Sequence, residues 1–120
     1  MIKILIVEDN LFLQKTLEEK LANFLDIVIK DTTQNGEEAI AILEKNHVID
    51  LILMDIQMPI MNGYETTLEI RKLNQNIKTP IIALTAGIML GEKEKCIESG
   101  MNDYISKPII EGEVEAKLKK

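Results

Sequence analysis

The sequence predicts an α/β fold with a doubly wound parallel sheet of five strands, and three observations lead to it. Five short apolar segments alternate along the 120-residue chain with longer segments whose apolar residues recur at helical spacing. Continuous apolar segments are typical of strands buried on both faces, as in parallel sheets. Parallel strands need right-handed crossovers, so helices should cover both faces. The length suits a single domain over residues 1–120, with one core.

The first two strand–helix units are predicted from branched aliphatic segments followed by helical spacing. Lys3–Val7 reads as a buried strand, and Asn10 is placed to cap the following helix. The inward residues of that helix are expected to be Leu13, Leu17, Leu21 and Phe24. A second strand covers Ile27–Ile29, and the Asn35-Gly36 turn leads into the second helix. That helix carries Ala39, Ile40 and Leu43.

The third and fourth units follow the same pattern. Leu51–Met54 is the third strand, and Met61-Asn62-Gly63 separates it from a helix expected to turn Leu68 and Leu73 inward. Pro80 opens the fourth strand, where a missing amide donor is tolerated. Gly87 and Gly91 bracket the next loop, before a polar helix over Glu92–Ser99 that Gly100 ends.

The fifth unit is short. Tyr104 and Ile105 form the predicted strand, and a last helix carries Val114 and Leu118 four residues apart. No internal repeat, linker or low-complexity segment interrupts the five units.

The composition narrows the function classes. Hydrophobic residues make up 46% of the chain and charged residues 28%, which is typical of a soluble globular domain. A net charge of −6 and 3% aromatic residues argue against a nucleic-acid binder and against binding to an anionic membrane. Cys96 is alone, so no internal disulfide is possible. The chain begins almost inside its first apolar segment and no segment approaches a membrane span, so a cytoplasmic location is expected.

Polar residues with site chemistry stand at the carboxyl ends of four predicted strands. Glu8 and Asp9 follow the first strand, Asp55 follows the third, Thr85 the fourth and Lys107 the fifth. Open α/β sheets bind ligands at this edge. Converging carboxylates repel one another, and a hard divalent cation with oxygen ligands relieves that repulsion. The sequence therefore predicts a site for Mg²⁺ and a phosphoryl group.

Each of these residues also has a simpler explanation. Asp55 taken alone fits a solvated acid at a strand end, and Glu8 and Asp9 fit an acidic pair before a helix N-terminus. Thr85 fits a helix cap as well as a donor to a phosphoryl oxygen, and Lys107 fits an ordinary surface lysine. Three further residues are expected to have ordinary structural roles: Tyr104 as a half-buried strand aromatic, His47 as a helix-end residue, and Cys96 on a polar helix.

Five motifs, in order along nearly the whole chain, resemble the receiver domain of bacterial two-component response regulators. They are Ile-Leu-Ile-Val-Glu-Asp-Asn at 4–10, Leu-Ile-Leu-Met-Asp-Ile-Gln-Met-Pro at 51–59, Asn-Gly-Tyr-Glu at 62–65, Pro-Ile-Ile-Ala-Leu-Thr-Ala at 80–86, and Gly-Met-Asn-Asp-Tyr-Ile-Ser-Lys-Pro-Ile at 100–109. The residues around Asp55 and Lys107 look most like receivers associated with hybrid histidine kinases. The resemblance implies a flavodoxin-like (βα)5 fold.

The resemblance also implies roles for individual residues. Asp55 would accept a phosphoryl group from a histidine kinase or a histidine phosphotransfer protein. Mg²⁺ would be held by Glu8, Asp9 and Asp55, with the backbone carbonyl of Gln57. Thr85 and Lys107 would bind the phosphoryl oxygens.

Switching is implied as well. Tyr104 would move inward, and the surface around it would change its binding to a downstream partner or attached domain. The Lys107-Pro108 peptide bond is expected to be cis. Two features depart from the family pattern: the first acid is Glu8 where aspartate is common, and the last helix, beginning Glu111-Gly112-Glu113, is short.

The sequence thus predicts a phosphorylation-dependent signalling switch that is not an enzyme beyond catalysing its own phosphorylation and dephosphorylation. One alternative is a receiver-like interaction module that is never phosphorylated. Another is an aspartyl-phosphate phosphohydrolase, although such enzymes commonly need a second acid where Gln57 stands. A flavodoxin-like nucleotide binder is disfavoured, because no glycine-rich phosphate loop follows the first strand.

Overall fold

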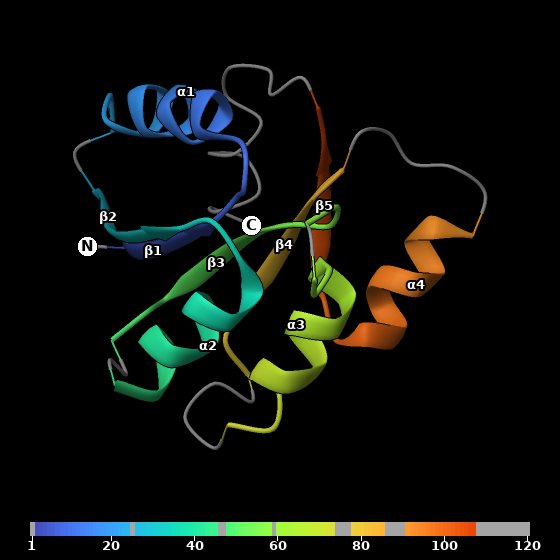
Figure 1. The fold of residues 1–120 in the computed structure, drawn as a ribbon. Coiled ribbons are helices and arrows are strands. Elements are labelled where there is room, and N and C mark those ends of the chain that lie inside the picture. Colours follow the sequence, from blue (N-terminus) through green and yellow to red (C-terminus); the bar gives the residue numbers. More distant parts are fainter. Residues whose placement is uncertain are drawn as a thin grey trace.

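The computed structural model describes residues 2–24, 26–45, 48–58, 60–73, 78–85 and 91–107. Its five strands form one parallel sheet in the order β2-β1-β3-β4-β5 (Figure 1). The strands are β1 (Ile2–Val7), β2 (Ile27–Thr33), β3 (Leu51–Asp55), β4 (Ile81–Thr85) and β5 (Asp103–Ser106). The helices are α1 (Leu11–Leu21), α2 (Gly36–Lys45), α3 (Gly63–Ile70) and α4 (Glu92–Ser99). The predicted doubly wound fold is confirmed, while the predicted last helix lies outside the described residues.

Two apolar clusters cover the two faces of the sheet. On one face, alternate residues of the strands pack against α2, α3 and α4 through side chains such as Leu43, Ile70 and Cys96. On the other face, the intervening strand residues pack against α1 through Leu17 and Leu21. The central strands β3 and β4 are buried at all five positions, which explains their continuous apolar sequences. No helix among the described segments is long and apolar enough to span a membrane.

The predicted helix boundaries agree with the structure at their caps. The Asn10 side chain accepts a hydrogen bond from the backbone N–H of Leu13 at 3.1 Å, which begins α1. Asn62 and Glu65 form a reciprocal capping box at the start of α3. Gly100 ends α4 at a φ of 104°, a left-handed conformation that favours glycine.

One inward residue of α3 was predicted wrongly. Leu68 is 49% exposed, and the face of α3 that packs on the molecule is built from Thr66, Thr67 and Ile70, with Leu73 packed beyond the helix end. The small residue Thr66 lies where α2 approaches α3, because a Cβ on Gly36 would lie 2.0 Å from the Thr66 hydroxyl oxygen. Leu68 lies instead at the surface, beside Lys95 and Glu98 of α4.

The strand order places the site. The chain leaves β1 toward β2 on one side and reaches β3 on the other, so the carboxyl ends of β1 and β3 lie at a topological switch point. The parallel register pairs Val7 with Met54, which sets the next residues, Glu8 and Asp55, level with each other.

Candidate functional site

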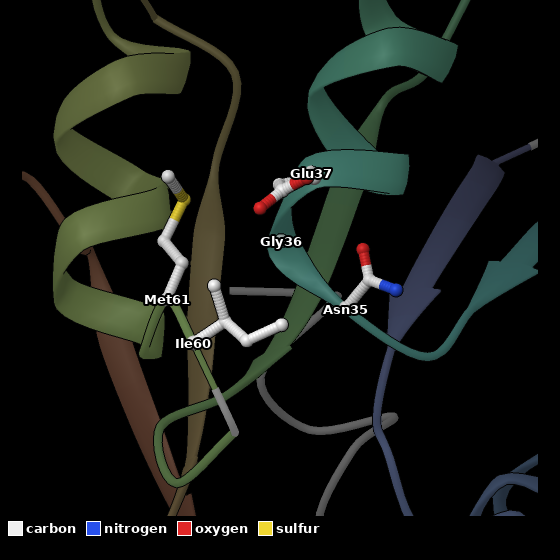
Figure 2. Close-up of a pocket in the computed structure, with 5 residues that line it drawn as sticks. All are labelled: Asn35, Gly36, Glu37, Ile60 and Met61. Carbon is white, nitrogen blue, oxygen red and sulfur yellow. The ribbon is translucent and has the colours of Figure 1, made fainter.

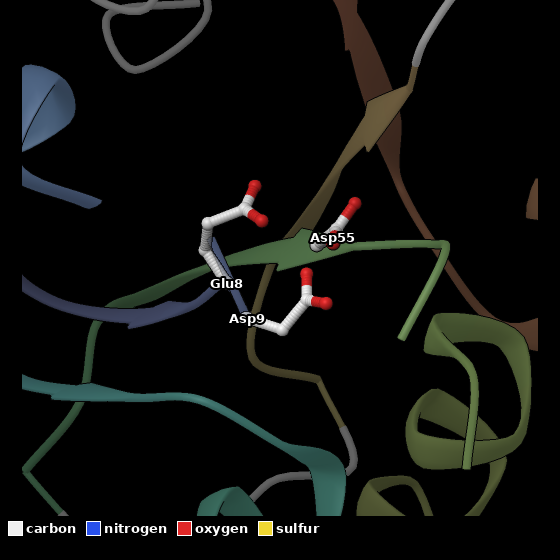
Figure 3. A group of neighbouring side chains, drawn as sticks. All are labelled: Glu8, Asp9 and Asp55. Carbon is white, nitrogen blue, oxygen red and sulfur yellow. The ribbon is translucent and has the colours of Figure 1, made fainter. Parts of the chain in front are cut away.

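Three carboxylates meet at the carboxyl ends of β1 and β3. Glu8 and Asp9 directly follow β1, and Asp55 is the last residue of β3 (Figure 3). One carboxylate oxygen from each residue lies within 4.8 Å of the other two. The predicted acidic cluster is therefore present, and it is assembled by sheet register between segments about fifty residues apart in sequence.

Burial distinguishes the three acids. Glu8 is 1% exposed and Asp55 is 2% exposed, whereas Asp9 is open to solvent. The Lys107 ammonium reaches over the two buried acids. Its Nζ donates a hydrogen bond to Asp55 Oδ1 at 3.0 Å, and it forms an ion pair with Glu8 Oε1, also at 3.0 Å. Lys107 is thus the counter-ion of the two buried carboxylates and not a surface lysine.

The cluster raises the pKa of Asp55. Burial is the largest cause, the hydrogen bond with Asp9 and the negative charge of Glu8 add to it, and Lys107 opposes them; together they raise the pKa of the Asp55 carboxyl from 3.8 to about 7. For Lys107, burial works toward a lower pKa, yet the two carboxylates prevail and the pKa of the ammonium is raised. The Lys107 ammonium therefore stays charged, while the pKa of the Asp55 carboxyl lies close to neutral pH.

The donor set fits a hard divalent cation. With all three acids ionised, three negative charges face one ammonium, which leaves two negative charges uncompensated. Burial is the largest cause of the raised pKa of Asp55, and the neighbouring acids Asp9 and Glu8 add to it. Mg²⁺ carries the missing charge and prefers carboxylate oxygens and water over nitrogen or sulfur ligands.

Thr85 lies next to the cluster and has an unused hydroxyl. It is the last residue of β4 and is 2% exposed, and its backbone carbonyl accepts a hydrogen bond from the Lys107 N–H at 2.6 Å. Within the described part of the chain, the buried Oγ1 has no hydrogen-bond partner. A buried hydroxyl without a partner is unusual, and it fits a group that hydrogen-bonds to a ligand oxygen.

Tyr104 lies further along the same face of the sheet. It pairs with Ala83 in the register of β4 and β5, and side chains alternate along a strand, so Tyr104 and Thr85 share the face that α4 covers. Tyr104 is half-buried, as predicted, and it lines a cavity of about 60 Å³ together with Cys96 and Met101.

The other predicted features are placed only in part by the described residues. Gln57 is exposed, two residues beyond Asp55. His47 and Pro108 lie outside the described residues, so the expected cis peptide bond stays a prediction. Cys96 is on α4 as predicted, but it is 3% exposed; burial raises the pKa of its thiol, which favours the unreactive form.

The sequence did not identify Gln14 as a site residue. Its side chain is buried on α1, and its Nε2 donates to the backbone carbonyls of Glu8 and Thr33. The available signal was helical spacing: Gln14 lies three residues before Leu17 and seven before Leu21, on the stripe that is buried. A polar residue on a buried stripe needs partners, and here they are at the edge of the acidic cluster.

Nothing in the sequence indicated that Ile60 is unusual in its backbone conformation and exposure. It follows Asp55 by five residues, is 89% exposed, and has a φ of 70°, which is rare for a β-branched residue. With Met61 it borders a cavity of about 50 Å³ at the beginning of α2, next to Asn35, Gly36 and Glu37 (Figure 2). None of the residues lining that cavity belongs to the acidic cluster.

Comparison with known proteins gives consistent matches. Residues 4–119 match the response regulator receiver domain family. The chain is 43% identical over 114 residues to hybrid signal transduction histidine kinase I of Dictyostelium discoideum, and 40% identical over 106 residues to the sensor histidine kinase RcsC of Escherichia coli. These matches cover 89% and 88% of this chain but only 6% and 11% of the two kinases.

A solved structure agrees with the fold. The receiver domain of a sensor histidine kinase from Pseudomonas aeruginosa PAO1, with a magnesium ion coordinated in its active site cleft, is 38% identical to this chain. The TM-score is 0.87, and the match covers 98% of this chain and 93% of that one.

Proposed function

Because the chain belongs to the response regulator receiver domain family of two-component signalling, we propose that it is a phosphorylation switch whose phosphoacceptor is Asp55. The observation that carries the proposal is the surroundings of Asp55: a buried carboxylate, with Lys107 Nζ at 3.0 Å and two further acids within 4.8 Å. The relatives are histidine kinases, which supports a phosphohistidine on a kinase or phosphotransfer protein as the donor.

The chemistry assigned to Asp55 is nucleophilic. A carboxylate oxygen attacks phosphorus, an oxygen–phosphorus bond forms, and the nitrogen–phosphorus bond to the donor imidazole breaks. The imidazole takes up a proton from solvent as it leaves. Lys107 is close enough to neutralise negative charge on the transferred group, and the unpartnered Thr85 hydroxyl is available to donate to one of its oxygens.

Glu8, Asp9 and Asp55 are the residues that would hold Mg²⁺. When bound, the ion supplies charge neutralisation at the phosphoryl oxygens. Asp9 is solvent-exposed and free of the Lys107 ion pair, so it is the better candidate for direct contact. Glu8 is occupied by Lys107 and accepts a hydrogen bond from the Asn10 N–H, which favours an outer role.

The site supports a switch better than it supports an enzyme acting on small molecules. Phosphohydrolases of this chemistry commonly use a second acid two residues after the nucleophile, and Gln57 stands there. The proposed activity is limited to the domain's own phosphorylation and dephosphorylation. The message would then pass to a protein partner or an attached domain through the surface around Tyr104.

Labelling with a small phosphodonor tests the proposal. The chain is incubated with acetyl phosphate and Mg²⁺ and its intact mass is measured. We expect one phosphoryl group on the wild type, removable by hydroxylamine as an acyl phosphate should be, and none on Asp55→Asn. The matched control Asp31→Asn changes an exposed aspartate on β2 and should be labelled like the wild type.

Three outcomes would contradict the proposal. Equal labelling of Asp55→Asn, or a label on serine or threonine, would remove Asp55 from its role. No labelling of the wild type by any phosphodonor would favour an interaction module that is not phosphorylated. Continuous release of phosphate from a small metabolite would favour the phosphohydrolase.

A further inference from the structure

A buried glutamine on α1 is bonded to the backbone that carries the first two acids. Gln14 is 7% exposed, and its side-chain Nε2 donates to the Glu8 carbonyl at 2.7 Å and to the Thr33 carbonyl at 2.8 Å. Both protons of the side-chain amide are therefore used. The bond to Glu8 is the costlier one to lose, because the Thr33 carbonyl also accepts from the Glu8 N–H whereas the buried Gln14 amide is the side-chain donor to the Glu8 carbonyl.

These bonds fix the peptide group between Glu8 and Asp9. The Glu8 N–H donates to the Thr33 carbonyl at 3.0 Å, and the Glu8 carbonyl is the oxygen that Gln14 holds. Glu8 is thus fastened through both of its backbone polar groups to the end of β2 and to α1. Because the Glu8 carbonyl belongs to the planar peptide group that leads into Asp9, holding it fixes the position of the Asp9 N and Cα atoms from which the side chain leaves the backbone.

We infer that Gln14 is a positioning residue for the Mg²⁺ site, and this inference rests on the proposed function. Without the ion, Glu8, Asp9 and Asp55 repel one another, and the exposed Asp9 is the one that can swing outward. Gln14 holds the backbone at Glu8, directly before Asp9, and so limits the outward movement of Asp9. The acids are therefore in place before the ion binds. Groups that orient metal ligands through such bonds commonly change metal affinity by about 10- to 100-fold when they are removed.

The first test uses the unmodified chain. NMR spectra are recorded during a Mg²⁺ titration, following the Gln14 side-chain amide protons and the backbone amide of Asp9. We expect the Gln14 protons to exchange slowly with solvent and to shift with the same midpoint as Asp9. Gln14 signals that exchange rapidly and do not respond while Asp9 does would overturn the inference.

The second test removes the donors. Gln14→Met keeps the length of the side chain but has no N–H groups, and Gln14→Asn keeps the amide but is too short to reach both carbonyls. The matched control is Ser99→Ala, which removes another buried side-chain donor to a backbone carbonyl, the 2.9 Å bond to Cys96 on α4. Mg²⁺ dissociation constants are measured for the folded proteins by calorimetry.

A positioning role and a purely structural role give different results. We expect Gln14→Met to bind Mg²⁺ about 10- to 100-fold more weakly, Gln14→Asn to lie between it and the wild type, and Ser99→Ala to match the wild type. A Gln14→Met protein that unfolds at lower temperature yet binds Mg²⁺ normally would reduce Gln14 to a structural residue. If Gln14→Met does not fold, normal binding by Gln14→Asn has the same meaning. Absence of Mg²⁺ binding in the wild type would instead overturn the proposed metal site, and this inference with it.

Discussion

At the scale of single residues, the surroundings of Asp55 disfavour the ionised form of its carboxyl group. Its carboxylate is buried beside two other acids, and the ammonium of Lys107 compensates only part of that charge. The consequence is a pKa raised to about 7, chiefly by burial. An amide of the same shape would avoid the cost of burying this negative charge. A carboxyl group with so strongly raised a pKa is therefore typical of a functional site.

Asp55→Asn should therefore stabilise the metal-free protein, and the gain should depend on pH. Between about pH 4 and pH 7 the folded state holds a proton on Asp55 that the unfolded chain, with a pKa of 3.8, has released. The contribution of Asp55 to the stability of the wild type is therefore fully present below that range and is lost as pH rises through 7. The advantage of Asp55→Asn should grow across the range to about 1 kcal/mol or more, measured by urea unfolding.

Two comparisons check the cause. Asp31→Asn should give no such pH dependence, since Asp31 is exposed. Saturating Mg²⁺ should reduce the difference in stability between Asp55→Asn and the wild type, because the ion supplies positive charge that balances the Asp55 carboxylate. If the free energies of unfolding of Asp55→Asn and the wild type differed by the same amount at every pH from 4 to 8, the role of burial would be contradicted.

At the scale of elements, the end of α3 is tied to the ends of its neighbours by one side chain. The Arg71 guanidinium donates to the Gly100 carbonyl from Nε at 3.0 Å and from Nη2 at 2.7 Å. It also donates to the Thr79 carbonyl and to Asn102 Oδ1. These partners lie where α4 ends and just before β4 and β5 begin, at the opposite end of the strands from Asp55.

Arg71→Leu should lower the free energy of unfolding by about 2 kcal/mol or more, because partly buried carbonyls lose a charged donor. Labelling at Asp55 should remain, since the network lies at the other end of the sheet. The matched control is its neighbour, Lys72→Ala, whose exposed ion pair with Glu69 should contribute less than about 0.5 kcal/mol. Denaturant unfolding measures both, and equal effects would show that the Arg71 bonds are dispensable.

At the scale of the whole molecule, the proposed switch predicts that the face formed by α4 and β5 carries the signal away from Asp55. Thr85 and Tyr104 share this face, and Tyr104 borders a cavity of about 60 Å³ beside α4. The exposed surface of α4 carries charges of both signs, from Lys93 and Lys95 and from Glu94 and Glu98. A half-buried side chain that borders a cavity, on the same sheet face as an unpartnered hydroxyl, is an element that a phosphoryl group at Asp55 could bias.

Phosphorylation should change amide hydrogen exchange mainly at residues 85–107 and spare α1. A shift of about 1–3 kcal/mol in this face is enough to change partner affinity by roughly 5- to 150-fold. Thr85→Ala should accept the phosphoryl group but transmit little of the change, because the hydroxyl proposed to bind the phosphoryl group is gone. Exchange changes confined to α1, or a normal response in Thr85→Ala, would place the output elsewhere or demote Thr85 to a structural residue.

The sequence by itself determined the architecture and most of the site. Short continuous apolar segments are typical of strands buried on both faces, and parallel strands require the observed alternation with helices. That order brings the residues after each strand to one edge, so Glu8, Asp9, Asp55 and Lys107 were predicted together and are found together. Local chemistry also determined the caps at Asn10 and Gly100.

Only the tertiary structure decided which of several possible contacts each side chain makes. The inward face of α3 depends on how the helix packs on its neighbours: Thr66 is buried where Gly36 of α2 comes close, Thr67 is buried near Gly100, and Leu68 is exposed. The partners of Gln14 are backbone carbonyls six and nineteen residues away, which no local pattern encodes. Likewise, the raised pKa of Asp55 arises from burial and from acids that the sheet register brings near. Periodicity and local propensity act over a few residues, whereas these properties depend on distances between elements, which packing sets.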